Sequence, residues 1–221
     1  MTAAVWSKVD EYIELKLVKQ DRANSQALRA NAEAGLRPID VSPAQGKFLN
    51  LLVRMSGAKR VLEIGTLGAY STIWMAKALP ADGAVVTLEY DPHHAEVARQ
   101  NIKRAGLSDR ITVRVGAAAE TLPLLAAENP EPFDLVFIDA DKPSNTVYLD
   151  WAIKLGRPGT VIVLDNVVRD GQLVNAASSD PNVLGSRGAF DLIAANSRLS
   201  ATALQTVGAK GYDGFAIAIL D

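Results

Sequence analysis

From residue 60 onward, five short apolar runs alternate with segments of helical periodicity, and this alternation limits the fold more than any other feature. Strands that alternate with helices predict a parallel sheet joined by right-handed crossovers. The runs are apolar almost throughout, which is typical of a sheet buried on both faces. The predicted strands are 61–64, 85–88, 111–115, 135–138 and 160–164.

Both ends of the chain depart from this alternation. Apolar residues at helical spacing predict three helices before the first strand, and Ser42-Pro43 suits the start of the third. After the fifth strand we expect a long loop, one helix and an antiparallel hairpin. These segments are helices at about 5–17, 21–35 and 43–57, a loop at 167–185, a helix at about 187–197, and strands at 202–207 and 215–220 around a turn at 208–214. We predict one domain over residues 1–221, with a helical cover (1–57) and a core (58–221).

Residues 61–71 read VLEIGTLGAYS, which predicts a strand, a glycine turn and the start of a helix. Such a turn can hold a nucleotide, because glycine lets the backbone approach a ligand closely. It is not the G-x-G-x-x-G dinucleotide motif, since Leu67 and Tyr70 stand where glycines are needed. A tight turn without a ligand would use glycine equally well. Glu89 favours a cofactor, because it ends the second strand, where an acid can bind a ribose diol.

Oxygen-bearing side chains follow two of the predicted strands. Asp139 comes directly after the fourth strand, and Asp165 and Asn166 follow the fifth. Acids at the same edge of a sheet repel one another unless a cation lies between them, and oxygen ligands suit Mg²⁺, Mn²⁺ or Ca²⁺. Such acids can also simply cap helices or turns, but two acids with an amide favour a metal. Lys142 is a candidate general base, although most lysines are solvated surface residues.

The composition is that of an ordinary globular protein and excludes several classes of function. The chain has 221 residues, a net charge of −2 and no cysteine. Disulfides, thiolate metal sites and cysteine nucleophiles are therefore excluded, and nothing suggests binding to nucleic acid or to an anionic membrane. Charges come too early for a signal peptide, and no apolar run is long enough to span a bilayer. We expect a soluble, cytoplasmic protein.

Four segments together resemble a known family, the cation-dependent O-methyltransferases that use S-adenosylmethionine (SAM), of the caffeoyl-CoA and catechol O-methyltransferase type. The segments read VLEIGTLGAYS, VVTLEYDP, FDLVFIDADK and VLDN, and the separation of IDADK from LDN is the most specific feature. The resemblance runs from about Val41 to the C-terminus and includes the YDG sequence at 212–214. It implies an α/β, Rossmann-like class I methyltransferase fold. Its seven-stranded, mostly parallel sheet would carry an antiparallel C-terminal hairpin and helices on both faces.

The resemblance also implies roles for single residues. Lys142 would be the catalytic base, and Asp139, Asp165 and Asn166 would bind Mg²⁺ or another divalent cation such as Mn²⁺ or Ca²⁺. The residues implied to bind SAM are Val41, Glu63, Gly65, Thr66, Ser71 near its carboxylate, Glu89 on the ribose, Ala118 beside the adenine, and Asp139. The family often has a polar residue where this chain has Ala117, so the resemblance implies no side-chain hydrogen bond to the adenine at this position.

The expected reaction is methylation of one hydroxyl of a catechol-like vicinal diol. The acceptor would be a small molecule such as a free catechol or a hydroxycinnamoyl thioester, recognised by the N-terminus and by the loop near 167–187. We also expect a homodimer, because the N-terminal helices have more apolar surface than the sheet needs. One alternative is an NAD(P)-dependent oxidoreductase, against which the missing dinucleotide motif argues. The other is a non-catalytic cofactor-binding protein, against which the intact Asp139, Lys142 and Asp165 argue.

Overall fold

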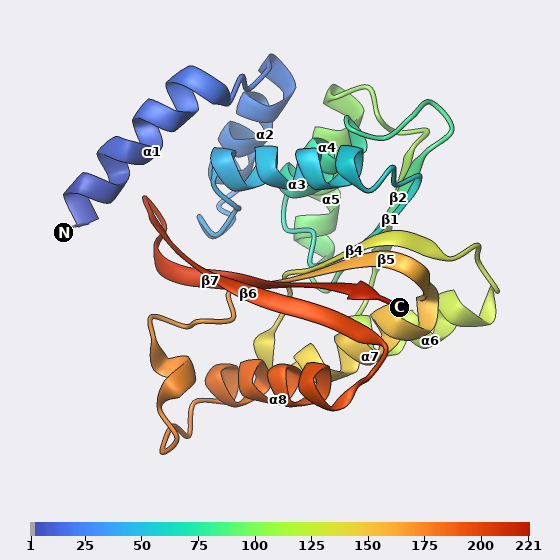
Figure 1. Cartoon of the computed structure of the whole chain (residues 1–221). Helices are drawn as coiled ribbons and strands as arrows, with labels where there is room; N and C mark the ends of the chain where they lie inside the picture. Colours follow the sequence, from blue (N-terminus) through green and yellow to red (C-terminus); the bar gives the residue numbers. More distant parts are fainter. Residues whose placement is uncertain (1–2) are drawn as a thin grey trace.

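The computed structural model describes residues 3–221 and contains a seven-stranded sheet with helices on both faces (Figure 1). The strand order is β3-β2-β1-β4-β5-β7-β6. Only β7 runs against the other strands, because it pairs antiparallel with both of its neighbours. The strands are β1 (Arg60–Ile64), β2 (Ala84–Glu89), β3 (Ile111–Val115), β4 (Phe133–Ile138), β5 (Gly156–Asp165), β6 (Leu199–Gly208) and β7 (Gly211–Leu220). The predicted fold class is confirmed.

The helices cover the sheet in two layers, and each layer has its own apolar core. Helices α2 to α5 pack on one face and α6 to α8 on the other; in Figure 1, α3 and α4 lie above the sheet and α7 and α8 below it. The helices are α1 (Ala3–Leu17), α2 (Arg22–Glu33), α3 (Pro43–Met55), α4 (Tyr70–Ala76), α5 (Pro92–Arg104), α6 (Ala118–Ala127), α7 (Asn145–Leu155) and α8 (Pro181–Ala195). None of them is both long and apolar enough to cross a bilayer.

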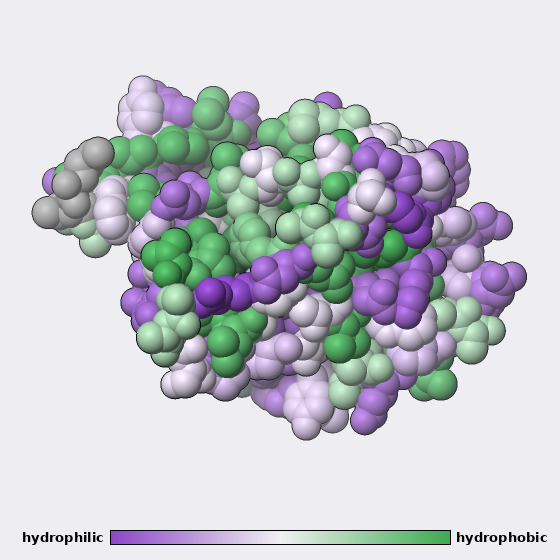
Figure 2. Space-filling view, turned by 60° about the horizontal axis from the view of Figure 1, so that its bottom comes forward, coloured by the Kyte–Doolittle hydropathy of each residue, from purple (hydrophilic) through white to green (hydrophobic). Residues whose placement is uncertain are grey.

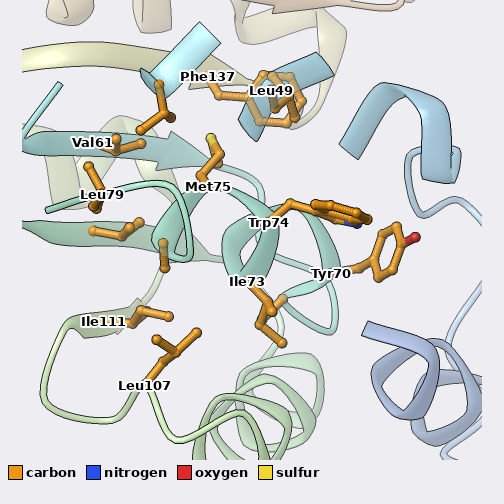
Figure 3. Packing of buried hydrophobic residues seen from close by; sticks show 14 of the residues in the cluster. Leu49, Val61, Tyr70, Ile73, Trp74, Met75, Leu79, Leu107, Ile111 and Phe137 are labelled. Atoms are coloured by element: carbon orange, nitrogen blue, oxygen red, sulfur yellow. The ribbon is translucent and has the colours of Figure 1, made fainter. Parts of the chain in front are cut away.

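Helix α3 packs closely against α4, the helix that follows the glycine turn after β1. Leu49 of α3 and Trp74 and Ile73 of α4 belong to one buried cluster, and Trp74 is oriented edge-on to Tyr70 (Figure 3). A Cβ atom added at Gly46 would lie 2.4 Å from Cδ1 of Trp74. A glycine on α3 therefore lets the two helices approach, and this contact holds the N-terminal cover against the core.

Three helices begin with the same local device, an N-cap residue followed by proline. Ser42, Asp91 and Asp180 each accept a hydrogen bond from a backbone N–H of the first helical turn. This pattern corrects one prediction. We expected a loop to residue 185 and a helix from about 187, but Asp180 and the proline that follows it start α8 at Pro181. The loop is correspondingly shorter.

The C-terminal hairpin is longer than predicted. We expected strands at 202–207 and 215–220 joined by a turn through Gly208, Gly211 and Gly214. The turn consists only of residues 209–210, because Gly208 pairs with Gly211. Gly214 lies inside β7, where a Cβ atom would come within 2.3 Å of the carbonyl oxygen of Leu204. Its role is close approach between strands, not a turn. The fifth strand is also longer than 160–164, because β5 begins at Gly156 and contains a register shift against β4.

Helix α1 forms as the periodicity predicted, but it buries no residue. Its contact with the hairpin tip is polar, since Oδ2 of Asp10 accepts a hydrogen bond from the backbone N–H of Ala209 at 2.7 Å. Five of its apolar side chains are exposed, namely Val5, Val9, Tyr12, Leu15 and Leu17. Figure 2 shows apolar side chains over this helix at the left of the molecule.

Candidate active site

A cavity of about 830 Å³ lies at the carboxyl ends of the parallel strands, the edge at which open α/β sheets bind ligands. Its volume is typical of small-molecule and cofactor pockets. The lining includes Gly65–Leu67, Ser71, Glu89, Ala117, Ala118, Asp139–Lys142, Asn166 and Arg169 from the sheet side, and Arg37 and Ile39–Val41 from the linker between α2 and α3. Of the site residues predicted from the sequence, Glu63 and Asp165 lie outside this lining.

The glycine turn after β1 has an unusual backbone. Gly65 has a φ of 101°, and Leu67 and Ala69 have φ values of 49° and 67°, a region that costs non-glycine residues free energy. A Cβ atom at Gly65 would lie 2.4 Å from the carbonyl oxygen of Asp139. Glycine is therefore required at residue 65 for β1 and β4 to end side by side, which brings the turn and Asp139 into one wall.

The Glu89 carboxylate holds this turn in place. Oε2 accepts hydrogen bonds from the backbone N–H groups of Thr66 at 3.1 Å and Leu67 at 2.7 Å. Oε1 accepts one from Asp91 at 2.9 Å and lies 3.4 Å from Nδ1 of His94. A carboxylate has about four acceptor positions, so one remains for a ligand. Glu89 thus has a structural role that its place at the end of a strand did not reveal.

Glu63 is fully buried and reaches the cavity only through its neighbours. It accepts hydrogen bonds from the hydroxyls of Ser71 at 2.5 Å and Thr87 at 2.7 Å, and a further one from Thr72. Burial raises the pKa of Glu63 to about 7, although these three hydroxyls oppose the shift. Because Ser71 does line the cavity, Glu63 orients Ser71, and an effect of Glu63 on a ligand would pass through that hydroxyl.

Lys142 and Asp139 form an ion pair at the wall. Nζ of Lys142 lies 2.8 Å from Oδ1 of Asp139, and the lysine side chain is 8% exposed. Helix α8 lies directly on the backbone of Lys142, because a Cβ atom at Gly185 would come within 2.0 Å of its carbonyl oxygen. The lysine is therefore a buried residue with a defined position, unlike the solvated surface lysine that was the alternative.

Asp165 is buried beside this pair. Its Oδ2 accepts a hydrogen bond from Nε2 of Gln45 at 2.5 Å, and its Oδ1 accepts one from the backbone N–H of Asn166 at 2.8 Å. Burial and the negative charge of Asp139 raise the pKa of Asp165 well above its usual range, and Lys142 opposes this shift. Asn166 has a φ of 55° and lines the cavity.

Asp139, Asp165 and Asn166 all offer side-chain oxygens, which suit a hard divalent cation. Within residues 3–221 no group of three His, Cys, Asp or Glu side chains could hold a metal ion. A cation here would therefore depend on Asn166 as its third protein ligand, beside Asp139 and Asp165. The repulsion between the two carboxylates is the observation that fits such a cation, because a positive charge between them would offset it. The all-oxygen donors are those that Mg²⁺ prefers.

Several lining residues have no role assigned from the sequence. Asp141 accepts hydrogen bonds from the hydroxyls of Tyr148 and Ser144, and burial raises the pKa of Tyr148. Its place after β4 could have identified it, and the same rule applies to Arg169 after β5. Arg37 carries no such signal, because it lies in a linker between two helices with no motif around it.

Known proteins resemble the whole chain. A family model described as O-methyltransferase matches residues 17–208. The catechol O-methyltransferase of Niastella koreensis is 51% identical over 220 residues, and the match covers 100% of each chain. The O-methyltransferase from Bacillus cereus, solved in complex with SAH, is 53% identical with a TM-score of 0.98 over 100% of both chains. The O-methyltransferase TomG from Streptomyces achromogenes, involved in tomaymycin synthesis and solved with SAM, is 45% identical with a TM-score of 0.96, covering 100% of this chain and 99% of that one.

Proposed function

The chain belongs to the O-methyltransferase family, and we propose that it methylates one hydroxyl of a catechol-like vicinal diol in a reaction that requires a divalent cation. That it is a SAM-dependent O-methyltransferase follows from the family and from relatives solved with SAH or SAM. Neither the oxidoreductase nor the non-catalytic alternative holds for such a chain. The observation that carries the finer proposal is the cluster of Asp139 and Asn166, which line the cavity, with the buried Lys142 and Asp165. Assays of methyl transfer from SAM to catechol, with and without a chelator, test it.

The cofactor would bind along the wall that runs from the glycine turn to Ala118. Glu89 has one acceptor position left for a ribose hydroxyl, and Ser71 presents a hydroxyl to the cavity. The absence of a side chain longer than a methyl group at Ala117 and Ala118 leaves room for a flat base. The relative named catechol O-methyltransferase supports a diol as the acceptor. When bound, SAM supplies the electrophilic methyl group.

Asp139, Asp165 and Asn166 would hold the divalent cation, which supplies the Lewis acidity that makes a diol hydroxyl easier to ionise. Gln45 contributes from the N-terminal cover. Its amide donates to Oδ2 of Asp165 at 2.5 Å and so keeps that carboxylate in one orientation. The cover therefore supports the site as well as enclosing it.

Lys142 would take the proton from the attacking hydroxyl at the lone pair of its Nζ atom, a step that starts from the neutral amine and leaves the ammonium form. Asp139 orients this amine through the 2.8 Å contact, and the low exposure of the side chain keeps bulk water from it. A base held in one position beside the acceptor contributes through general base catalysis and through positioning.

The cofactor role of Glu89 leads to one expected result. We expect Glu89→Gln to weaken the binding of S-adenosylhomocysteine about 10-fold to 100-fold, because hydrogen bonds to a charged group contribute about 1.5–3 kcal/mol. Isothermal titration calorimetry measures this directly. The glutamine variant is preferable to alanine, because its one amide oxygen can still accept from Thr66 and Leu67, whereas alanine would remove all three backbone hydrogen bonds that Glu89 accepts.

Glu96→Gln is the matched control, because Glu96 is exposed on the nearby helix α5. It should leave both the affinity and the unfolding temperature unchanged. An affinity of Glu89→Gln equal to that of the wild type would remove Glu89 from the cofactor site.

We further propose a homodimer that buries the exposed apolar side chains of α1, among them Leu15 and Tyr12. Light scattering at micromolar concentration should report about twice the chain mass of 23.5 kDa. Leu15→Glu, which places a charge on the most exposed of these side chains, should shift the mass towards the monomer. A wild-type protein that is monomeric at this concentration would contradict the proposal.

A further inference from the structure

Two arginines line the cavity, and the functions assigned above use neither of them. Arg37 comes from the linker between α2 and α3, and Arg169 from the loop that follows β5. A guanidinium group is charged at every accessible pH and carries five N–H donors. The cavity would also receive a sulfonium and a divalent cation, and additional positive charges beside these are unfavourable unless an anion binds with them.

The carboxylates of the cavity wall already have other partners. Asp139 is paired with Lys142, and Asp141 accepts hydrogen bonds from two hydroxyls. Glu89 holds the glycine turn, and Oδ1 of Asp40 accepts a hydrogen bond from Nδ2 of Asn31 at 2.8 Å. Within residues 3–221, Asp213 is the only acid that forms a salt bridge with Arg169. The arginines therefore do not serve to neutralise the acids of the wall.

The loop that carries Arg169 has a defined conformation. Oδ1 of Asp213 accepts hydrogen bonds from the backbone N–H groups of Val168 at 2.9 Å, Arg169 at 3.0 Å and Gly214 at 2.9 Å. Arg169 itself has a φ of 55°, which this anchoring maintains. The guanidinium is thus presented at the cavity by a loop tied to β7.

The guanidinium of Arg169 retains unused hydrogen-bonding capacity. Nη1 lies 3.6 Å from Oδ2 of Asp213, which is longer than a hydrogen bond. Nε is buried and has no hydrogen-bond partner in the protein. Because Nε is covered by protein atoms, a ligand in the cavity would meet the Nη groups. A carboxylate fits best, since it can accept two parallel hydrogen bonds from one guanidinium.

We propose that Arg169 binds a carboxylate on the acceptor, so that the preferred acceptors are catechols that carry a carboxylate group. Arg169 follows Asn166 by three residues on the same loop, which places it on the side of the cavity that would hold the diol. The glycine turn, which would hold the cofactor, lies at the end of β1 instead. This inference rests on the proposed diol methylation.

The test compares 3,4-dihydroxybenzoate with its methyl ester at saturating SAM and Mg²⁺. The two acceptors differ in intrinsic reactivity, so the informative quantity is the change in their kcat/KM ratio between wild type and variant. We expect Arg169→Gln to lower the ratio of kcat/KM for the acid to kcat/KM for the ester about 10-fold or more, mainly because KM for the acid rises. The kcat/KM of the variant for the neutral ester should stay within about twofold of the wild-type value.

Arg198→Gln is the control, because it removes an exposed positive charge between α8 and β6, outside the cavity lining. It should leave the ratio unchanged. An equal loss for acid and ester in Arg169→Gln would overturn the proposal. So would weaker binding of S-adenosylhomocysteine in that variant, because the anion would then be the carboxylate of the cofactor. If neither acceptor is methylated by the wild type, the proposed diol methylation fails instead.

Discussion

Removal of divalent cations by a chelator should abolish methyl transfer to catechol, and addition of Mg²⁺ should restore it. The reason lies in the charge distribution of the site. Burial and the negative charge of Asp139 raise the pKa of Asp165, and Lys142 is paired with Asp139. Without a divalent cation, nothing in the proposed site would position the diol or make its hydroxyl easier to ionise. The measurement is the initial rate of SAH formation with and without excess chelator.

Asp165→Asn should lose methyl transfer to catechol even in the presence of Mg²⁺, as the wild type does in excess chelator. Asparagine keeps the volume and one oxygen acceptor, so the contact with Gln45 can persist, while the charge that a cation needs is removed. The variant loses the repulsion by Asp139 but also loses the hydrogen bond from the backbone N–H of Asn166, so its unfolding temperature is measured beside its activity.

Asp150→Asn, which changes an exposed carboxylate on α7, is the matched control and should keep full activity. Full activity of the wild-type protein in excess chelator would exclude the metal mechanism. Full activity of Asp165→Asn would show that the cation does not depend on this residue.

Replacement of Lys142 should reduce the rate about 10²-fold to 10⁴-fold, the usual contribution of a general base. Lys142→Met is the sharper variant, because it keeps most of the buried aliphatic chain and removes the amine that lies 2.8 Å from Asp139. Lys142→Ala should show the same rate loss with a larger loss of stability. Both variants should still bind S-adenosylhomocysteine, since no contact with the cofactor is assigned to Lys142.

The pH dependence separates a base from a merely structural lysine. In Lys142→Met the rate should rise with pH more steeply than in the wild type, because hydroxide ions can then ionise the acceptor in place of the lysine. Lys154→Met removes an exposed lysine on α7 and should leave the pH profile unchanged. An undiminished rate of Lys142→Met at neutral pH would contradict the assignment of the base.

The predictions that were confirmed depend on short stretches of chain. Apolar runs that alternate with helical periodicity led to the five parallel strands, and their boundaries agree with β1 to β4 to within about two residues. Glu89, Asp139 and Asn166 were expected at one cavity because each follows or ends a parallel strand, and parallel strands bring their carboxyl ends to the same edge of the sheet. All three do line the cavity. The start of α8 was predicted too late because one local signal in the sequence was overlooked. That signal is the Asp180-Pro181 pair, an N-cap followed by proline.

Other features of the site arise between residues far apart in the sequence. Gln45 orients Asp165 across 120 positions, and Asp213 anchors the loop of Arg169 across 44. Glu89 was expected to bind only a ligand, yet it also holds the backbone of the glycine turn. Glu63 stands inside the strand before that turn, but only the packing shows that it lies behind Ser71.

The sequence by itself therefore determined the order of strands and helices, the edge of the sheet at which a ligand binds, and which acids and lysine gather there. These depend on periodicity, on N-cap and proline signals, and on the direction of parallel strands, all of which are local or follow from chain order. Only the tertiary structure decided that the linker with Arg37 forms part of the cavity wall, that Lys142 is buried against α8, and that Arg169 is presented by a loop tied to β7. Such contacts depend on how side chains of distant segments fill the same space, and no periodic pattern encodes that packing.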